Sequence, residues 1–277
     1  MTNNTPSAAN EPLLKVTDLS KNFGGLRAVN RINLELMPGD LAGLIGPNGA
    51  GKTTAFNLIT GVYEQSEGQV VFKGQEIGGL APHLINQMGI ARTFQNIRLF
   101  PNLTVLENVC IAYHSHAGYS MNDAILRNGK FETKEKELFE KAQDFLSIFN
   151  MQDRQGEIAS NLPYGQQRRL EIARALAAEP QLLLLDEPAA GMNPNESMAL
   201  MDLIHFIRDR FKLTILLIEH QMRVVMGVCE KITVMDFGEV IAHGVPEEIQ
   251  SDPRVVEAYL GRGAAELAQK LQRSKAQ

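Results

Sequence analysis

The chain has 277 residues, 44% of them hydrophobic and 21% charged, so it can bury the core of one large or two modest domains and is too apolar to be disordered. Its 27 basic and 32 acidic residues give a net charge of −5, which excludes a basic field for nucleic acid or an anionic membrane surface. The two cysteines, Cys110 and Cys229, are too few for a disulfide framework and favour buried thiols in a reducing compartment.

The N-terminal stretch, residues 1–12, is polar and lacks the basic start and apolar run of a secretory signal. We therefore expect disorder there and no export. Apolar runs such as 182–185 and 215–218 are of strand length, far below the roughly 18 residues of a membrane-spanning helix. Any association with a membrane is therefore expected to run through other proteins.

The first part of the chain predicts a β-rich start. Apolar residues indicate short strands at 14–20 and 32–36, and a buried strand at 41–45 that leads through glycines into a helix. A strand and turn follow at 69–74, and helices are expected at 104–112 and 133–149. The last of these has one apolar face at helical spacing, formed by Leu138, Ala142, Phe145, Leu146 and Phe149.

The second half of the chain alternates strands with helices. Strands predicted at 181–185 and 213–218 flank a periodic helix at 195–211, which is typical of a parallel sheet with crossover helices. Residues 232–235 and 240–242 indicate a hairpin, and a helix at 253–260 is expected to be capped by Asp252. The tail after residue 261 is expected to be a frayed helix.

A glycine-rich loop follows the strand at 41–45 and matches the phosphate-binding pattern G-x-x-x-x-G-K-[ST]. Its backbone N–H groups and the following helix N-terminus would bind phosphate oxygens. Lys52 would reach the β- and γ-phosphates, and the Thr53 hydroxyl would coordinate Mg²⁺. The alternative is a chance glycine-rich turn, which the strand and helix context disfavours. The predicted nucleotide-binding residues here are Gly46, Pro47, Asn48, Gly49, Ala50, Gly51, Lys52, Thr53 and Thr54.

Two adjacent carboxylates, Asp186 and Glu187, end the apolar strand at 181–185. They emerge at the carboxyl edge, where open α/β sheets bind ligands. Asp186 is predicted to hold the magnesium shell, directly or through water. Glu187 is then left to accept a proton from the attacking water or to orient it. A solvated strand end is the alternative, and the accompanying phosphate loop makes it the lesser one.

A third segment, residues 162–174 (LPYGQQRRLEIAR), lies just before the acidic strand. Together the three features resemble the ATP-binding cassette (ABC) ATPases, whose L-S-G-G-Q signature lies at about this distance from that strand. The resemblance covers about residues 13–261, with 262–277 as a tail. It implies an α/β P-loop NTPase with a RecA-like parallel sheet core, an N-terminal antiparallel β subdomain and an α-helical insert at about 96–160. ATP and Mg²⁺ are the ligands it implies.

The resemblance also assigns roles to isolated side chains. Phe23 would stack on adenine, Gln95 would contact Mg²⁺ and water and relay the nucleotide state to the insert, and His220 would reach the γ-phosphate. Each alone would more often be core filler or a surface polar group. His114 and His116 have metal-like spacing but no partners, so we expect exposed helix-end residues. The signature residues expected at the partner's nucleotide are Leu162, Pro163, Tyr164, Gly165 and Gln166.

Among ABC ATPases the chain is most similar to the ATP-binding subunits of branched-chain amino acid importers. The segments that carry this resemblance are FGGLRAV at 23–29, YGQQRRLEIAR at 164–174, EPAAGMNP at 187–194 and EAYLG at 257–261. The resemblance implies a second ATPase subunit, either a sister or a second copy, two permease subunits, and indirectly an external substrate-binding protein. It places the chain at the cytoplasmic face of a bacterial inner membrane, with no nucleic-acid partner.

Two positions depart from the family pattern. Pro163 replaces the signature serine and offers neither hydroxyl nor N–H, and Tyr164 replaces the first glycine, so a weaker grip on the partner's nucleotide is expected. Asn193 stands where many cassettes carry aspartate. It would hydrogen-bond across a dimer, cap the following helix, or do both.

Three other functions compete with this interpretation. An ATPase for another cargo, such as urea or an exported lipid, shares most of the motifs. A soluble cassette acting on DNA or ribosomes would usually carry two cassettes or a long coiled-coil insert, and this chain has neither. A P-loop kinase or RecA-like enzyme would have no reason for residues 162–173.

Overall fold

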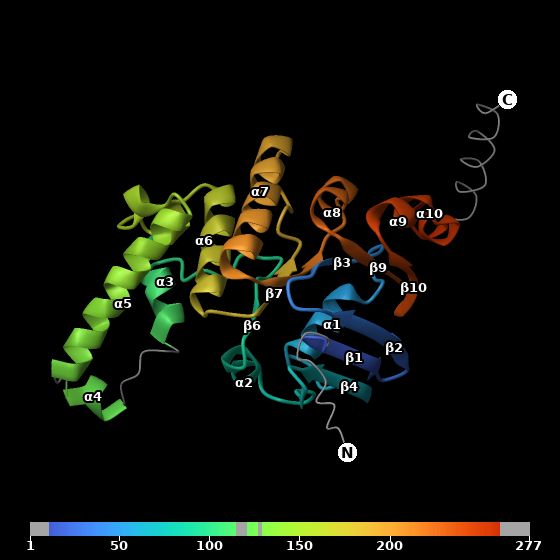
Figure 1. The fold of residues 1–277 in the computed structure, drawn as a ribbon, viewed down its shortest axis with the longest axis horizontal. Helices are drawn as coiled ribbons and strands as arrows, with labels where there is room; N and C mark the ends of the chain where they lie inside the picture. The colour runs from blue at the N-terminus through green and yellow to red at the C-terminus, as the bar shows by residue number, and fades with distance from the viewer. Residues whose placement is uncertain (1–10, 115–120, 127–128, 261–277) are drawn as a thin grey trace, which may run out of the picture. The chain divides into compact units, whose positions relative to one another are not determined.

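Figure 1 shows the computed structural model of the chain, which describes residues 11–114, 121–126 and 129–260. The chain divides into two compact units, Met1–Ile85 with Leu184–Gln277, and Asn86–Leu183. Within the described residues, no helix has the length and apolarity needed to cross a membrane. The predictions for residues 1–10, His116 and the tail lie outside the described ranges.

The first unit contains an antiparallel sheet in the order β2-β1-β4-β5. Both long strands extend beyond the predicted ranges, because they continue to a tight turn at which Phe23 pairs with Leu26. The residues near this turn are exposed and lack an apolar alternation, so the pattern showed only the buried parts of the strands. The strands are β1 (Leu14–Phe23), β2 (Leu26–Leu36), β4 (Glu67–Phe72) and β5 (Gln75–Glu76).

A second sheet forms the centre of the first unit, with strands in the order β10-β9-β3-β8-β7. Strand β3 is parallel to both β8 and β9, whereas β9 and β10 form the predicted antiparallel hairpin. Every residue of β3, β7 and β8 is buried, as in parallel strands that are covered on both faces. The strands are β3 (Leu41–Ile45), β7 (Leu182–Asp186), β8 (Thr214–Ile218), β9 (Lys231–Asp236) and β10 (Glu239–Gly244).

Helices connect and cover the strands of this sheet. Helix α1 follows the predicted phosphate loop, and α7 and α8 lie next to each other in Figure 1. Asn193 caps α7: its side chain accepts the N–H groups of Asn195 and Glu196, and Pro194 is the first helical residue. The predicted capping role of Asn193 is thus confirmed. The helices are α1 (Lys52–Ile59), α7 (Pro194–Phe211), α8 (Met222–Val228), α9 (Pro246–Ser251) and α10 (Pro253–Leu260).

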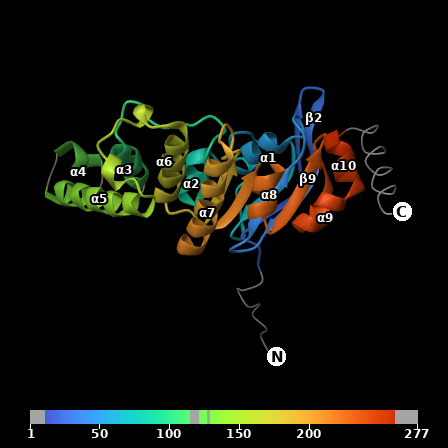
Figure 2. The same ribbon diagram turned by 90° about the horizontal axis from the view of Figure 1, so that it is seen from above.

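The second unit is mainly helical. Helices α3 and α5 lie side by side in both views (Figure 2), joined by an edge-to-face contact of Tyr113 and Phe145 at 5.9 Å. The five residues predicted to form one apolar face are all buried. Four of them lie in α5, and Phe149 directly follows it. The elements are β6 (Ile90–Arg92), α3 (Val105–Tyr113), α4 (Met121–Leu126), α5 (Gly129–Ile148), two short 3₁₀ turns and α6 (Tyr164–Ala177), with α2 (Pro82–Gln87) at the boundary.

The sequence patterns missed α2, α4, α8, β5 and β6, which are too short for a period to emerge. The helix expected to start at Gly165 and Gln166 is α6. Cys110 and Cys229 are buried free thiols, as predicted, and burial raises their pKa to about 11 and about 12. His114 is exposed at a helix end, also as predicted, and its Nε2 lies 3.0 Å from Glu135 Oε1.

Candidate functional site

The phosphate loop, residues 46–53, joins β3 to α1, and close backbone contacts require its first and last glycines. A Cβ on Gly46 (φ +148°) would lie 2.0 Å from the Met235 carbonyl oxygen, and one on Gly51 (φ +100°) would lie 2.6 Å from the Ala28 carbonyl oxygen. A Cβ on Gly49, in contrast, would meet nothing within 4 Å. The loop is therefore backed by protein near its ends and open at Gly49, as a phosphate cradle requires.

Lys52 is buried at the start of α1, and its ammonium group donates to the carbonyl oxygens of Gly46 (2.7 Å) and Pro47 (2.9 Å). Burial lowers the pKa of Lys52, while the nearby carboxylates of Glu187 and Asp186 act to raise it. The structure thus brings the loop lysine and the two predicted acidic residues into one electrostatic environment. A phosphate group, with its strong anionic acceptors, fits this cation.

At the end of β7, the two adjacent carboxylates differ in their burial. Asp186 is buried, whereas the Glu187 side chain is partly exposed. Glu187 has a left-handed backbone (φ +45°), and its N–H donates to the Ile218 carbonyl oxygen at 2.9 Å. Such a conformation costs about 1–3 kcal/mol in a residue other than glycine. Neighbouring structure therefore holds Glu187 in a position that the chain would not otherwise adopt.

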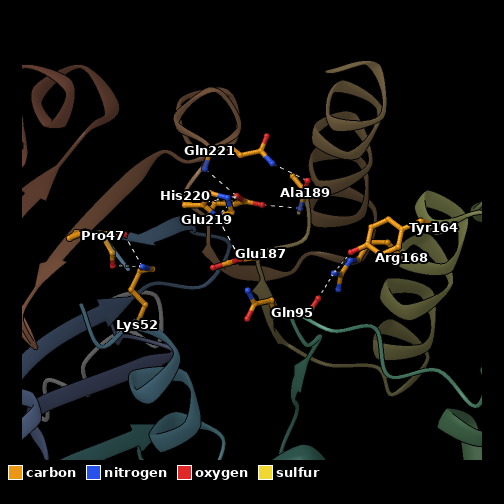
Figure 3. Close-up of polar contacts among 11 residues, drawn as sticks. Pro47, Lys52, Gln95, Tyr164, Arg168, Glu187, Ala189, Glu219, His220 and Gln221 are labelled. Atoms are coloured by element: carbon orange, nitrogen blue, oxygen red, sulfur yellow. Dashed lines mark hydrogen bonds and ion pairs between the residues drawn. The ribbon is translucent and has the colours of Figure 1, made fainter. Parts of the chain in front are cut away.

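His220 lies close to Glu187 (Figure 3), with 3.5 Å between its Nδ1 and Glu187 Oε2. Nearly half of its side chain is exposed. The structure therefore brings together the carboxylate predicted to act on water and the histidine predicted to reach the γ-phosphate.

Glu219, which sequence reasoning missed, is fully buried beside this pair. Its Oε1 accepts the N–H of Ala189 (2.8 Å), and its Oε2 accepts those of His220 (3.1 Å) and Gln221 (3.3 Å). Gln221 Nε2 also donates to the Ala189 carbonyl oxygen at 2.9 Å (Figure 3). Burial raises the pKa of Glu219, an effect that these backbone amides oppose. A carboxyl directly after the apolar strand β8 was the available signal.

Phe23 stands at the exposed end of the β1–β2 hairpin, with 41% of its surface exposed. Its ring makes an edge-to-face contact with Tyr63, at 5.3 Å between centroids, and Lys21 Nζ lies 5.3 Å from its centroid. A half-exposed ring that is held at its edge leaves area on which a flat aromatic ligand could stack. Tyr63 is a second residue that the sequence patterns missed.

The signature residues begin helix α6 in the second unit. Leu162 is buried, and Pro163 is the N-cap, with no side-chain cap bond; its carbonyl oxygen accepts the N–H groups of Gln166 and Gln167 at 2.9 and 3.0 Å. Tyr164 is 44% exposed. The helix N-terminus, with its partial positive charge, is thus formed without the usual serine.

Gln95 also belongs to the second unit, where its side chain is exposed and its carbonyl oxygen accepts a bond from Arg168 Nη2 at 2.7 Å. The predicted residues therefore fall into two groups, one in each unit. The phosphate loop, Asp186, Glu187 and His220 belong to the first unit, and Gln95 and residues 162–166 belong to the second.

Among the described residues, no cluster of three or more His, Cys, Asp or Glu side chains could hold a metal ion by itself. The Thr53 hydroxyl and the Asp186 carboxylate offer oxygen atoms, which Mg²⁺ prefers. This ion commonly takes one or two protein ligands, with phosphates and water completing its shell. The donor set thus fits Mg²⁺ bound together with a nucleotide.

Comparisons with known proteins show the family of the chain. A model of the ABC transporter family matches residues 29–190, and one described as the branched-chain amino acid ATP-binding cassette transporter matches residues 239–265. LivG of Escherichia coli K12, a high-affinity branched-chain amino acid transport ATP-binding protein, is 45% identical over 251 residues, which cover 91% of this chain and 98% of LivG.

Solved structures show the same fold. The ADP conformation of MJ1267, an ATP-binding cassette of an ABC transporter, has a TM-score of 0.79 and 32% identity, covering 91% of this chain and all of that one. A dimeric post-hydrolysis state of the cassette MJ0796, bound to ADP and Pi, has a TM-score of 0.71 and 25% identity, covering 84% and 98%. The predicted P-loop NTPase fold is thereby confirmed. The chain belongs to the ATP-hydrolysing cassettes of the ABC transporter family and is similar to those of branched-chain amino acid transport.

Proposed function

We propose that this chain hydrolyses ATP to drive an importer of branched-chain amino acids. The observation that carries the cargo assignment is the pairing of 45% identity to LivG with a match to the branched-chain amino acid cassette model at residues 239–265. Two permease subunits would cross the bilayer and hold the chain at the cytoplasmic face, with an external binding protein delivering the amino acid. These partners follow from the likeness to transport proteins.

Nucleotide binding is assigned to the first unit. Phe23 stacks on adenine, residues 46–54 surround the phosphates, and Lys52 pairs with the β- and γ-phosphates. The open face at Gly49 and the buried ammonium of Lys52 support this assignment. Thr53, Asp186 and Gln95 are the proposed residues around Mg²⁺, which when bound would neutralise charge on the phosphate oxygens.

Hydrolysis is assigned to Glu187. Its carboxylate accepts a proton from the attacking water, whose oxygen forms a bond to the γ-phosphorus. The bond from that phosphorus to the β–γ bridging oxygen breaks, and ADP leaves with the electron pair. His220, at 3.5 Å from Glu187, contacts the γ-phosphate.

A second cassette completes each site. Residues 162–166 contact ATP bound to the other subunit, and the dimeric state of MJ0796 supports this arrangement. ATP would close the dimer, and hydrolysis would reopen it because it removes the contacts of the γ-phosphate. Since Pro163 lacks a hydroxyl, binding of the other subunit's ATP relies on the backbone of α6. Unchanged ATPase activity and nucleotide affinity in Pro163→Ser of the assembled complex would contradict this point.

The test is purification of the tagged full-length chain from membranes with the proteins that accompany it, followed by ATPase assays. Two permease proteins should co-purify, and leucine together with its binding protein should stimulate ATPase activity. Stimulation by urea or by a lipid instead would reassign the cargo. Recovery without membrane proteins would favour a soluble cassette.

A further inference from the structure

An arginine and a glutamate of α6 form a buried ion pair. Arg168 and Glu171 are 0% and 1% exposed, and Arg168 Nη1 donates to Glu171 Oε2 at 2.6 Å. Burying two charges costs more free energy than their attraction returns unless further hydrogen bonds satisfy them. The further partners of this pair therefore indicate what it does.

Those partners are backbone groups of the segment that carries Gln95. Arg168 donates to the carbonyl oxygens of Phe94 (2.6 Å) and Gln95 (2.7 Å). Glu171 Oε1 accepts the N–H groups of Arg98 (3.0 Å) and Phe94 (3.4 Å). The pair thus binds both donors and acceptors of residues 94–98, which we call the glutamine segment. Figure 3 shows the arginine side of this contact.

The same pair is anchored in the signature helix. Arg168 lies one turn after Tyr164, and its Nη2 donates to the Tyr164 hydroxyl at 3.3 Å. Any shift of the glutamine segment relative to α6 would break several charge-assisted hydrogen bonds in a buried site, where unpaired charges cost most. The backbone of Gln95 and the start of α6 are therefore held as one body.

A separate buried residue, Asn108 of α3, fixes the chain just beyond the glutamine segment. Its Oδ1 accepts the Phe100 N–H at 2.9 Å, and its Nδ2 donates to the Phe100 carbonyl oxygen at 3.1 Å. The segment is thus held at both ends while the Gln95 side chain stays exposed. Its holding bonds are to backbone atoms, so they set the position of the Gln95 main chain.

We propose that Arg168 and Glu171 are positioning residues that make Gln95 move together with the signature residues. The proposal rests on the role given to Gln95 under the proposed function. A displacement of α6, when its N-terminus takes up ATP of the other subunit, is then transmitted to Gln95 without a separate contact. The pair is not a catalytic group, because both carboxylate oxygens of Glu171 and both terminal nitrogens of Arg168 already bond to the protein.

The test is a double-mutant cycle on ATP hydrolysis by the full transporter complex. Gln95→Ala and Arg168→Lys are compared singly and together, since lysine keeps the charge but lacks the planar fork that binds two carbonyl groups. We expect each single change to lower kcat about tenfold with little change in the KM for ATP. The double variant should then be no slower than Gln95→Ala alone. Multiplying effects in the double variant would overturn the proposal.

Arg154→Lys is the matched control, because Arg154 and Glu157 form an i,i+3 ion pair of the same spacing that is partly exposed. Its kcat should equal that of the wild type. If Arg168→Lys fails to fold, the paired replacement Arg168→Met with Glu171→Leu supplies an apolar alternative. A folded paired variant with wild-type kcat would also overturn the proposal. A different result would contradict the proposed cargo rather than the positioning role: Gln95→Ala loses activity, but leucine does not stimulate the wild type.

Discussion

Both units bury charged side chains to hold a functional loop, but they satisfy the charge differently. In the first unit the Glu219 carboxylate is bound by three backbone N–H groups, with the partly exposed His220 ring 3.9 Å away. In the second unit Arg168 and Glu171 neutralise each other and also bind backbone groups. A single carboxylate holds only N–H groups, whereas the pair holds carbonyl groups as well.

This difference predicts different sensitivities. The Glu219 contacts join Ala189, just after Glu187, to the backbone of His220. A change there should therefore disturb the residues proposed to act on water and on the γ-phosphate. A change in the Arg168–Glu171 pair should instead disturb the position of Gln95 relative to α6. Four variants or conditions, taken from the largest expected effect to the smallest, separate direct action on the reaction from action through the backbone.

Glu187→Gln should give the largest effect, because it removes the proposed proton acceptor itself. We expect steady-state hydrolysis to fall by about 10²–10⁴-fold, while ATP binding is retained because the phosphate loop is unaltered. Hydrolysis is measured by phosphate release and binding by a fluorescent ATP analogue. A variant that turns over at the wild-type rate would remove Glu187 from the mechanism.

Glu219→Gln should lower kcat less, by about tenfold, because it acts only through the positions of Ala189 and His220. In glutamine, a donating NH₂ group replaces one of the two accepting carboxylate oxygens. A backbone N–H that this oxygen accepted is then buried without a partner, at a cost of about 1–3 kcal/mol. Steady-state kinetics and thermal unfolding report the two effects. Glu230→Gln, which alters an exposed ion pair with Arg208, is the control and should change neither. Wild-type kcat in Glu219→Gln would show that its contacts serve stability alone.

The stability of the Glu219 site should also depend on pH. Burial raises the pKa of Glu219, so the protonated form is favoured by folding, and its contribution to stability is present at low pH and is lost as pH rises through the folded-state pKa. Relative to Glu219→Gln, the wild type should therefore lose stability as pH increases from about 4 towards neutral. Denaturant unfolding of both proteins across this range measures the difference. An unchanged difference would mean that the backbone amides fully offset burial.

Capping residues provide the smallest and most closely matched comparison. Asn193 and Thr104 each form a capping box, at α7 in the first unit and at α3 in the second. Replacing either by alanine should cost about 1 kcal/mol, or about 2–4 °C in Tm. We expect only Asn193→Ala to lower ATPase activity as well, because Asn193 ends the segment that follows Glu187. Equal loss of activity in both variants would indicate a general effect of instability.

The sequence predicted the parts of this molecule in which one local pattern decides the outcome. The strand at 41–45, the phosphate loop and the acidic end of β7 were predicted because apolar runs and glycine spacing are local. Glu219 was missed because its partner Ala189 lies thirty residues earlier, and only the pairing of β8 with its neighbours brings them together. The contacts of Arg168 and Glu171 were likewise missed. Both residues lie in the segment at 162–174, but their backbone partners lie more than 70 residues away.

The left-handed backbone of Glu187 implies a trade-off between stability and catalysis. Glycine adopts this conformation without strain, so Glu187→Gly should fold more stably than Glu187→Ala while both are inactive. The strain, of order 1–3 kcal/mol, is thus stored in the native cassette at the residue proposed to act on water. Selection for activity at this position opposes selection for stability, and stabilising variants that arise here should be inactive.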